Sequence, residues 1–329
     1  MQTRLRTTDA LVLVLVTFIW GSNFVVIRVG LQGFDPMLLA VIRFVAAAIP
    51  LVWLLPKPPV ATRWLALNGL FVGAGQFGLL FLALKADISP GLASLLMQMQ
   101  VFATILLAAG LLHEAVRPRQ WAGLAVGAVG LATVGWHLEA TSITPLGLAL
   151  VLCAASFWAA SNILTKVVSR RASAHAHESA SAGSETGAGA GTGAPLPMLA
   201  FVVWSSLYAI PPLLVLVAFT PGLQVAVQQL GSAQLSHWAA ALWQALGNTL
   251  IGYVAWSALL ARHPASVVTP WALLVPVFGM SSSAWLLGEP LPGWKLLAGA
   301  LVVAGIGITT WPAAVGPRPI AMTPGKEPT

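Results

Sequence analysis

The chain has 329 residues, of which 58% are hydrophobic and only 8% are charged. A soluble domain has about a quarter of its residues charged, so the charged side chains here are too few to cover a soluble protein of this length. The composition excludes a soluble enzyme, a secreted disulfide-linked domain and a disordered protein, and it predicts an all-α membrane protein. The net charge of +7 is explained by membrane topology, not by nucleic-acid binding.

Ten apolar segments, each near the roughly 20 residues that a membrane-spanning helix needs, follow one another with short connections. The first is too long for a signal peptide, and no cleavage site follows it. Cys153, the single cysteine, excludes an intrachain disulfide. The predicted transmembrane helices are 10–30, 35–55, 63–85, 90–112, 119–136, 145–168, 197–219, 237–261, 266–287 and 293–312.

The basic residues predict the orientation of these helices. If the N-terminus is cytoplasmic, most of the 16 Lys and Arg fall on the cytoplasmic side, three fall outside and Arg43 lies within the second helix. Cytoplasmic loops carry an excess of Lys and Arg, so we expect both termini to be cytoplasmic. The residues on the inside are Arg4, Arg6, Lys57, Arg63, Arg117, Arg119, Lys166, Arg170, Arg171, Arg262, Arg318 and Lys326, and those outside are Arg28, Lys85 and Lys295.

Similar residues recur at similar spacing in the two halves of the chain. Since five helices in the first copy is an odd number, the second copy is inverted in the membrane, as in many secondary transporters. The sequence therefore predicts ten transmembrane helices arranged as two inverted five-helix repeats. The matched sets are Trp20 and Arg28 with Trp158 and Lys166; Met37, Arg43 and Pro50 with Met198, Trp204 and Pro211; and Leu111–Glu114 with Leu286–Glu289.

Residues 172–196 interrupt the second repeat. This segment consists mostly of Ala, Gly, Ser and Thr, which cannot bury enough apolar surface to fold, so we expect a disordered cytoplasmic linker. The proline-containing residues 313–329 are expected to form a disordered tail. The predicted organisation is repeat 1 at 1–140, the first helix of repeat 2 at 141–171, the linker at 172–196, the rest of repeat 2 at 197–312, and the tail.

The predicted helices carry no residues suited to catalysis. They contain no paired carboxylates, no Ser/His/Asp set, no glycine-rich phosphate loop and no metal-ligand spacing. An intramembrane prenyl-transferring enzyme needs acidic clusters to hold a metal and a diphosphate, whereas Asp9, Asp35 and Asp87 each stand alone near helix ends. We therefore expect no enzyme activity, no metal site and no cofactor.

Arg43 is the most informative single residue. It lies about eight residues into the second predicted helix, where a charge costs at least ~2.5–3.5 kcal/mol on insertion scales. No acidic residue lies at the same depth to pair with it. Arg43 therefore either extends toward backbone carbonyls or the interface, or binds the carboxylate of a substrate with its planar guanidinium. We favour the second interpretation.

Amides and tryptophans are the other polar groups within apolar segments. Buried amides join neighbouring helices or face a cavity. Gln98 and Gln100 are about 200° apart on a regular helix, so we expect only one of them to face a cavity. Trp20, Trp158, Trp204, Trp256 and Trp271 either line such a cavity or anchor helix ends at the membrane interface. Glu114 and Glu289 are interpreted as residues that cap helices or order loops.

Glycines in helices 119–136 and 293–312 allow close packing of these two helices. They include Gly123, Gly127 and Gly130 in one helix and Gly299, Gly305 and Gly307 in the other. The contact joins either the two halves of one chain or two copies of the chain in a homodimer.

Several motifs resemble those of one transporter family, the EamA family of the drug/metabolite transporter superfamily. The motifs are Trp20–Gly30, Arg43-Phe44, Gln76-Phe77 and Pro90–Leu95. Others are similar to a narrower branch, the O-acetylserine/cysteine exporters. These are Gln98-Met99-Gln100, Ile251-Gly252-Tyr253 with Trp256, and Leu273–Val277.

The resemblance implies two EamA repeats, a bacterial inner-membrane location, no cofactor, and secondary active export of small amino-acid metabolites such as cysteine or O-acetylserine. Two alternatives stay open: a broader drug or metabolite exporter and a metabolite importer. Energy coupling by exchange, by downhill efflux or through Glu114 or Glu289 also stays open. The candidate substrate-binding residues are Arg43, Asn23, Trp20, Gln76, Gln98, Gln100, Trp158, Asn162, Asn248, Tyr253 and Trp256.

Overall fold

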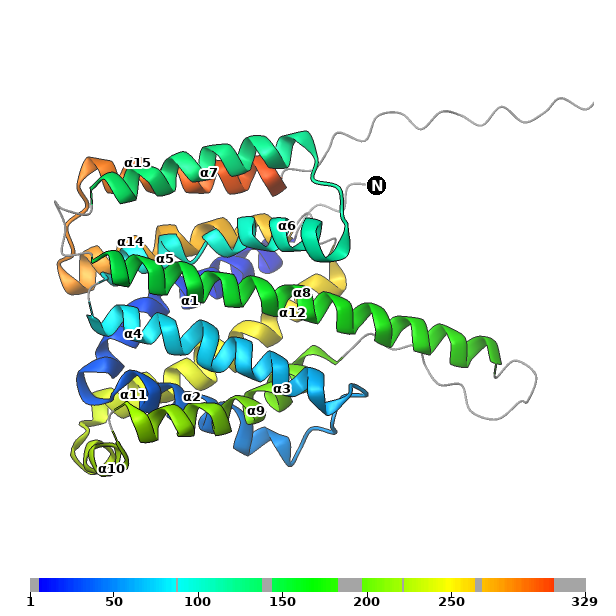
Figure 1. Ribbon diagram of the computed structural model, residues 1–329, viewed down its shortest axis with the longest axis horizontal. Coiled ribbons are helices and arrows are strands. Elements are labelled where there is room, and N and C mark those ends of the chain that lie inside the picture. Colours follow the sequence, from blue (N-terminus) through cyan, green and yellow to red (C-terminus); the bar gives the residue numbers. More distant parts are fainter. Residues whose placement is uncertain are drawn as a thin grey trace, which may run out of the picture.

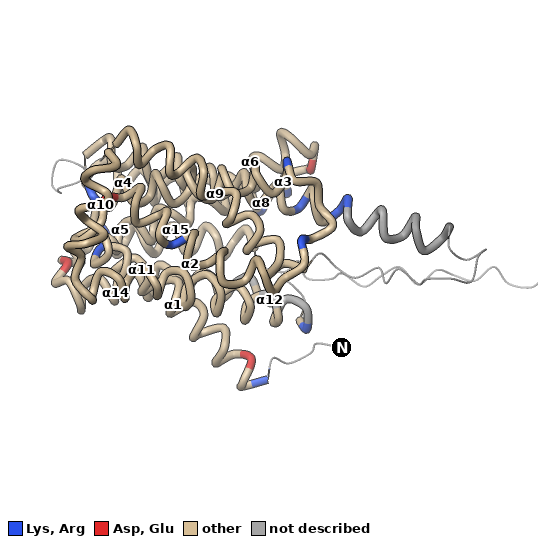
Figure 2. Tube along the Cα trace, turned by 90° about the horizontal axis from the view of Figure 1, so that it is seen from below, with Lys and Arg blue, Asp and Glu red and all other residues tan. Residues whose placement is uncertain are grey.

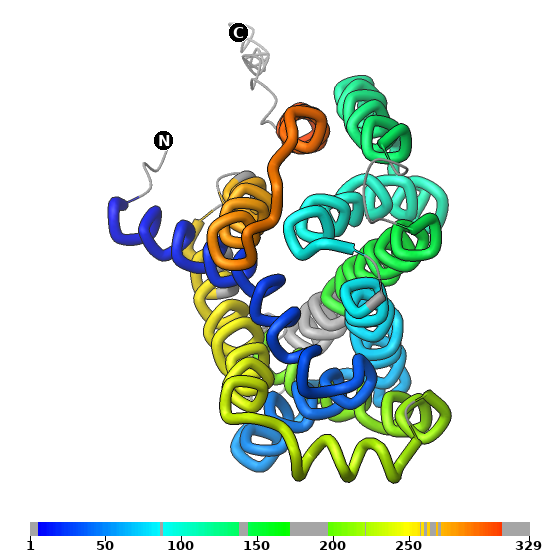
Figure 3. Tube along the Cα trace, turned by 90° about the vertical axis from the view of Figure 1, so that its left-hand side faces the viewer, coloured from blue at the N-terminus to red at the C-terminus, as the bar shows by residue number. Residues whose placement is uncertain are grey.

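The computed structural model describes residues 6–86, 88–137, 144–182, 197–220, 222–263 and 268–310, and every regular element in these ranges is helical. The helices form one bundle, seen from the side in Figure 1 and along the helices in Figure 3. The first part of the chain forms α1 (Thr7–Gly33), α2 (Pro36–Val52), α3 (Thr62–Leu70), η1 (Phe71–Gly78), α4 (Leu79–Ala86), α5 (Pro90–Leu96), α6 (Met99–Leu112) and α7 (Pro118–Trp136). The second part forms α8 (Pro145–Ala182), α9 (Met198–Phe219), α10 (Leu223–Ser232), α11 (Leu235–Trp243), η3 (Gln244–Ile251), α12 (Gly252–Arg262), η4 (Thr269–Leu273), α14 (Leu274–Leu287) and α15 (Gly293–Thr310).

Each of the helix ranges expected from the sequence is helical over most of its length. Within the described residues, six segments are long and apolar enough to cross a membrane, and Pro36–Val52 and Trp271–Leu287 are shorter apolar helices. The six are Thr7–Gly33, Thr62–Lys85, Pro90–Leu112, Pro145–Arg171, Met198–Phe219 and Gly293–Thr310.

Two helical segments differ from the prediction. The short helix α10 lies where a loop was expected. Helix α8 continues to Ala182, so residues 172–182 are helical although the linker was expected to begin at 172. Alanine recurs in this stretch and has the highest helix propensity of all residues. The interpretation of the stretch as a linker did not take this propensity into account. Residues 183–196 and the predicted tail at 313–329 lie outside the described residues.

Local capping explains several helix boundaries. Asp35 precedes α2 and its carboxylate accepts a hydrogen bond from the Met37 N–H at 2.9 Å, with Pro36 in the first turn. Ser89 caps α5 in the same way, ahead of Pro90. Polar N-caps and proline in the first turn are typical helix starts. The helices α6 and α14 both end at a left-handed residue, His113 and Gly288, at φ of 53° and 65°.

The two halves share unusual backbone features at corresponding places. The third helix of each half contains an eight-residue π-helical segment, η1 in one and η3 in the other. The fourth helix of each half is irregular near its start, between α5 and α6 and at η4 before α14. π-helical segments are frequent at functional sites, and both of these lie inside the bundle.

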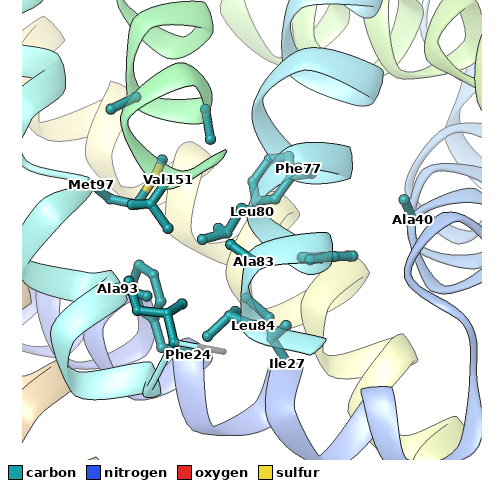
Figure 4. Close-up of a cluster of buried hydrophobic side chains, with 14 of the residues drawn as sticks. Phe24, Ile27, Ala40, Phe77, Leu80, Ala83, Leu84, Ala93, Met97 and Val151 are labelled. Carbon is teal, nitrogen blue, oxygen red and sulfur yellow. The ribbon is translucent and has the colours of Figure 1, made fainter. Parts of the chain in front are cut away.

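The core joins the two halves. Helix α1 packs against α14, α2 against α9, and α6 against α8. Figure 4 shows part of the buried apolar cluster, in which Ile27 of α1 lies beside Leu84 of α4 and Phe24 of α1 lies beside Ala93 of α5. In the first half, the packing thus holds α1 against α4 and α5.

Helices α7 and α15 lie side by side at the edge of the bundle (Figures 1 and 3). Their glycines permit the contact, because a Cβ added at Gly123 would lie 2.5 Å from the Gly305 carbonyl oxygen. A Cβ added at Gly305 would lie 2.7 Å from the Gly123 carbonyl oxygen. Of the two arrangements expected from these glycines, the structure shows the one within a single chain.

Most charged residues lie toward the two ends of the bundle (Figure 2). We name these the Glu114 end and the Glu289 end, after the carboxylates that follow α6 and α14. Near the Glu289 end, Arg28 of α1 donates to the Leu84 carbonyl, and Lys85 of α4 donates to the Leu31 carbonyl at 3.0 Å. The last carbonyls of a helix lack partners within it, so each of these two helices caps the other.

Candidate functional site

Two adjoining cavities lie inside the bundle. The smaller has a volume of about 200 Å³ and contains Arg43 in its wall. The larger has a volume of about 540 Å³ and is lined mainly by α1, α6 and α15, with further side chains from η1, α8, α12 and η4. Both walls include the same five residues, so the two cavities meet there. The shared residues are Gln76, Phe77, Trp158, Asn162 and Tyr253.

Arg43 is held between the two π-helical segments. Its side chain is only 1% exposed. One terminal nitrogen, Nη2, donates to the Thr249 hydroxyl of η3 at 3.0 Å. The guanidinium carbon lies 3.6 Å from the centre of the Phe77 ring of η1, a cation–π contact. The other two nitrogens, Nε and Nη1, have no hydrogen-bond partner among the described residues.

Thr249 depends on the π-helical geometry for this role. Its hydroxyl donates to the Gln244 carbonyl five residues earlier, at 3.0 Å. Since a hydroxyl carries one proton and two acceptor lone pairs, this bond leaves an acceptor for Arg43. The guanidinium is therefore fixed by a hydrogen bond on one side and an aromatic face on the other.

Aromatic side chains form one wall of the larger cavity. The ring centres of Trp20 and Trp256 are 5.1 Å apart, and those of Trp20 and Tyr253 are 5.6 Å apart. The Trp20 indole N–H donates to the Asn248 backbone carbonyl at 3.2 Å. This bond fixes the indole ring, so its face is held in place for a ligand.

Amide side chains also line the larger cavity. Asn162 of α8 donates to the Gln100 side-chain oxygen at 2.9 Å and lies 3.3 Å from the Thr104 hydroxyl. Gln98 donates to the Ala272 carbonyl of η4 at 3.2 Å. Asn23 differs from these residues, because its buried side-chain oxygen has no partner among the described residues. It is an unused acceptor beside the cavity.

The expectation that only one of Gln98 and Gln100 faces a cavity is wrong, because both line the larger cavity. The 200° separation assumed a regular helix, but the helix is interrupted at Met97 and Gln98. The backbone N–H groups of Gln98, Gln100 and Val101 each bond to the carbonyl three residues earlier. Such tight turns advance about 120° per residue, against about 100° in an α-helix, which brings the two amides closer together around the helix axis, and both line the cavity.

The larger cavity reaches toward the Glu114 end. Its wall includes Gln120 in the first turn of α7 and Thr309 and Thr310 in the last turn of α15. The residues that form the Arg28–Leu84 and Lys85–Leu31 bonds near the Glu289 end are not among the described residues of its wall. Residues of the Glu114 end thus belong to the wall of the larger cavity.

A buried ion pair joins three helices at the Glu289 end. Glu289 is bonded to Lys295 at 2.7 Å, and both side chains are less than 8% exposed. The carboxylate also accepts from the Ser89 and Ser283 hydroxyls and from the Gly91 N–H, at the start of α5. Burial raises the pKa of Glu289, but the hydrogen bonds from Lys295, Ser283 and Ser89 outweigh burial and bring the pKa below its ordinary value.

Glu114 occupies the corresponding position at the other end and is more open. It pairs with Lys166 at 2.7 Å and with Arg170 at 3.0 Å. The hydrogen bond from Lys166, with that from Arg170, lowers the pKa of Glu114. As expected for a residue that orders a loop, Glu114 joins the end of α6 to α8. Exposed pairs of this kind contribute little to stability.

A family model describes the chain as two copies of one unit. It is the model of the EamA-like transporter family, and it matches residues 8–136 and 179–311. The chain belongs to the EamA-like transporter family. The EamA match therefore supports a transporter with two repeats, and the chain is not an enzyme. The second match begins within α8, so the place of residues 145–178 in repeat 2 stays a prediction.

Curated relatives of this EamA-like transporter extend over nearly its whole length. It is 35% identical to a probable amino-acid metabolite efflux pump of Salmonella typhimurium, over 92% of this chain and 95% of that protein. It is 32% identical to a protein of the same name from Escherichia coli K12, with the same coverage. It is 28% identical to a probable terminal-alkyne amino-acid exporter of Streptantibioticus cattleyicolor, over 97% of each protein.

A solved crystal structure shares the fold of this EamA-like transporter. It has a TM-score of 0.53 and 17% sequence identity, and the match covers 93% of this chain and 99% of the other. At that identity the similarity concerns the fold alone.

The structure places all the candidate substrate-binding residues of this EamA-like transporter on the walls of the two cavities. Arg43 lines the smaller cavity; Gln76, Trp158, Asn162 and Tyr253 line both; and Asn23, Trp20, Gln98, Gln100, Asn248 and Trp256 line the larger. Two other tryptophans that were considered lie elsewhere. Trp204 donates to the Leu55 carbonyl, and Trp271 packs in an apolar cluster with Leu13.

Hydroxyl groups are the cavity residues that sequence reasoning missed. Thr249, Ser161, Ser205 and Ser206 line the smaller cavity. A hydroxyl in a transmembrane helix can bond to its own backbone, so it produces no signal like that of a charge. Among the described residues, no group of three or more His, Cys, Asp or Glu is placed to hold a metal ion.

Proposed function

We propose that this EamA-like transporter exports small amino-acid metabolites from the cytoplasm, with cysteine and O-acetylserine as the first candidates. The names of the curated relatives support amino-acid metabolites as the substrate class. The internal cavities support a small ligand, because their walls combine apolar and aromatic surface with a few polar groups.

The observation that carries the proposal is the unpaired charge of Arg43. A buried guanidinium with two unpartnered nitrogens is costly, and a carboxylate brought by the substrate would balance its charge and accept from an unpartnered N–H. Arg43 is thus proposed to bind the substrate carboxylate. It is the one charged residue in the two cavity walls, as the described residues define them.

The amine of the substrate would bind in the larger cavity. The unpartnered oxygen of Asn23 is an acceptor for an ammonium N–H. Trp20, Tyr253 and Trp256 offer aromatic faces that attract a cation. Gln76, Gln98, Gln100, Trp158, Asn162 and Asn248 are proposed to complete the wall around the substrate side chain.

We further propose that ten transmembrane helices form two inverted halves that provide alternating access. The paired π-helical segments and the paired left-handed residues after α6 and α14 support this symmetry. The distribution of Lys and Arg supports a bacterial inner-membrane protein with both termini in the cytoplasm. The Glu114 end is then cytoplasmic, and the described conformation would accept substrate from inside. A homodimer is a separate proposal, tested by the mass of the detergent-solubilised protein.

Counterflow in proteoliposomes tests the proposed function. Vesicles containing the purified protein are loaded with unlabelled candidates, and the uptake of labelled cysteine is followed. Stimulation by cysteine and O-acetylserine alone supports the narrow exporter, whereas stimulation by many amino acids or by cationic drugs supports a broader exporter. Net flux in cells separates export from import.

The variant Arg43→Gln is the matched test of the carboxylate interaction. We expect it to abolish cysteine counterflow, and Arg43→Lys to retain a fraction, because lysine keeps the charge but cannot offer two parallel N–H donors. Normal counterflow by Arg43→Gln, in protein that elutes as a single peak in size-exclusion chromatography, would overturn the proposed role of Arg43.

A further inference from the structure

Buried donors without partners cluster at the smaller cavity. Arg43 and Ser205 both line it. Three of their atoms lack a hydrogen-bond partner among the described residues: Nε and Nη1 of Arg43 and the hydroxyl oxygen of Ser205. Arg43 is 1% exposed and Ser205 is 3% exposed. They come from different helices, α2 and α9, which pack against each other.

These groups share one chemistry, because all of them can donate a proton to an acceptor. A guanidinium donates only, and a hydroxyl can donate one proton. The positive charge of Arg43 is not balanced by any carboxylate in the wall of the cavity, as far as the described residues show. A small anion would supply both the missing acceptors and the missing charge.

The cavity has room for such an anion and some water. Its volume of about 200 Å³ compares with roughly 30 Å³ for each molecule of liquid water. The Phe77 ring covers one face of the guanidinium, and Nη2 donates a hydrogen bond to the Thr249 hydroxyl. An anion is therefore expected to accept from the unpartnered Nε–H or Nη1–H, each of which shares an edge of the planar group with Nη2.

We infer that Arg43 and Ser205 form a binding site for a small monovalent anion, chloride in the first place, which is occupied when no substrate is present. The inference deepens the proposed function, since the substrate carboxylate would displace this anion from the same donors. The guanidinium is then never left buried and uncompensated between one substrate and the next. Chloride and the substrate carboxylate become competitors.

Thermal unfolding of the full-length protein in detergent tests the site without any substrate. The probes are sodium chloride and sodium 2-morpholinoethanesulfonate (MES) at equal ionic strength, because this bulky sulfonate lacks the carboxylate that Arg43 is proposed to bind. We expect chloride to raise the Tm by several degrees in a saturable manner, since a ligand that binds only the folded state stabilises it. We expect Arg43→Gln to lose this chloride-specific shift.

Ser205→Ala and Ser206→Ala form a matched pair that does not remove the charge. Both serines line the cavity, but the Ser206 hydroxyl already donates to the Val202 carbonyl at 2.8 Å. We expect Ser205→Ala to raise the chloride concentration for half-maximal stabilisation several-fold and Ser206→Ala to leave it unchanged. Equal chloride and MES curves in the unaltered protein, or an unchanged midpoint in Ser205→Ala, would overturn the inference.

A competition measurement separates this inference from the proposed function. If both hold, chloride raises the cysteine concentration needed for half-maximal counterflow. If the proposed function fails, no amino acid is transported and the chloride-specific stabilisation is still observed. If only the anion site fails, counterflow depends on Arg43 but is the same in chloride and in MES.

Discussion

Arg43 and Thr249 are 206 positions apart in the chain, yet the guanidinium of one donates to the hydroxyl of the other at 3.0 Å. The bond connects the second helix of the first half to the π-helical segment of the second half. It also makes Thr249 a positioning residue, because it occupies one nitrogen of Arg43 and leaves the other two available.

Thr249→Val tests this positioning. Valine has the shape of threonine without the hydroxyl, so the fold should persist while the guanidinium loses its anchor. We expect the cysteine concentration for half-maximal counterflow to rise about tenfold, which corresponds to about 1.4 kcal/mol, with the maximal rate changed less. Thr249→Ser keeps the hydroxyl and is expected to restore most of the affinity. Equal behaviour of the two variants would show that shape, not the hydrogen bond, matters at this position.

Cysteine labelling tests the position of the two glutamines. In a Cys153→Ser background, which removes the single native cysteine, we expect both Gln98→Cys and Gln100→Cys to react with a water-soluble thiol reagent. Leu96→Cys is the control, since Leu96 is fully buried and lies in neither cavity wall. Labelling at only one of the two glutamine positions would restore the regular-helix interpretation.

The pKa of Glu289 predicts a stability change at low pH. A carboxylate whose pKa is lower in the folded than in the unfolded protein stabilises the fold above its ordinary pKa of 4.5. That stabilisation is lost as the pH falls from 4.5 through the folded-state pKa. We expect the Tm to fall in this window and Glu289→Gln to reduce the fall, measured by thermal unfolding between pH 7 and pH 3.5.

Lys295 supplies the companion test at neutral pH. Lys295→Met leaves the buried Glu289 carboxylate without its partner, and breaking a buried pair on one side costs about 3–5 kcal/mol. We expect the double variant Glu289→Gln with Lys295→Met to be more stable than Lys295→Met alone. A double variant that is less stable than both single variants would contradict this account.

Glycine substitutions test the packing of α7 on α15. Gly123→Ala places a methyl group 2.5 Å from the Gly305 carbonyl oxygen, so the helices must separate. We expect a loss of about 1–3 kcal/mol, seen as a lower Tm. Gly135→Ala, in the same helix but with nothing within 4 Å of the added carbon, is expected to leave the Tm unchanged or higher.

The sequence predicts the helices better than it predicts their irregularities. Apolar segments beginning at Pro36, Pro90 or Pro118 define helices directly, because proline fits the first turn of a helix. Gln76 and Asn248 were found because an amide is conspicuous in an apolar segment. The π-helical segments produce no comparable signal in the sequence. Without them, the hydrogen bond between Thr249 and Arg43 could not be predicted.

Corrections arose where local backbone geometry overrode average periodicity. Because of the tight turns at Met97 and Gln98, both glutamines line the same cavity. The rule of 100° per residue does not predict this. Ser205 and Ser206 look alike in the sequence, yet only the Ser206 hydroxyl bonds to its own helix. Such differences depend on the neighbouring helix, and a single sequence does not contain them.

The bonding of the three basic residues near the Glu289 end has a consequence for the surrounding lipids. Arg28 and Lys85 are bonded to helix carbonyls and Lys295 to Glu289. The Glu114 end instead exposes Lys57, Arg63, Arg117 and Arg171. Anionic headgroups attract basic residues at a membrane surface. The leaflet around the Glu114 end should therefore become enriched in acidic lipids, while the leaflet around the Glu289 end keeps its average composition.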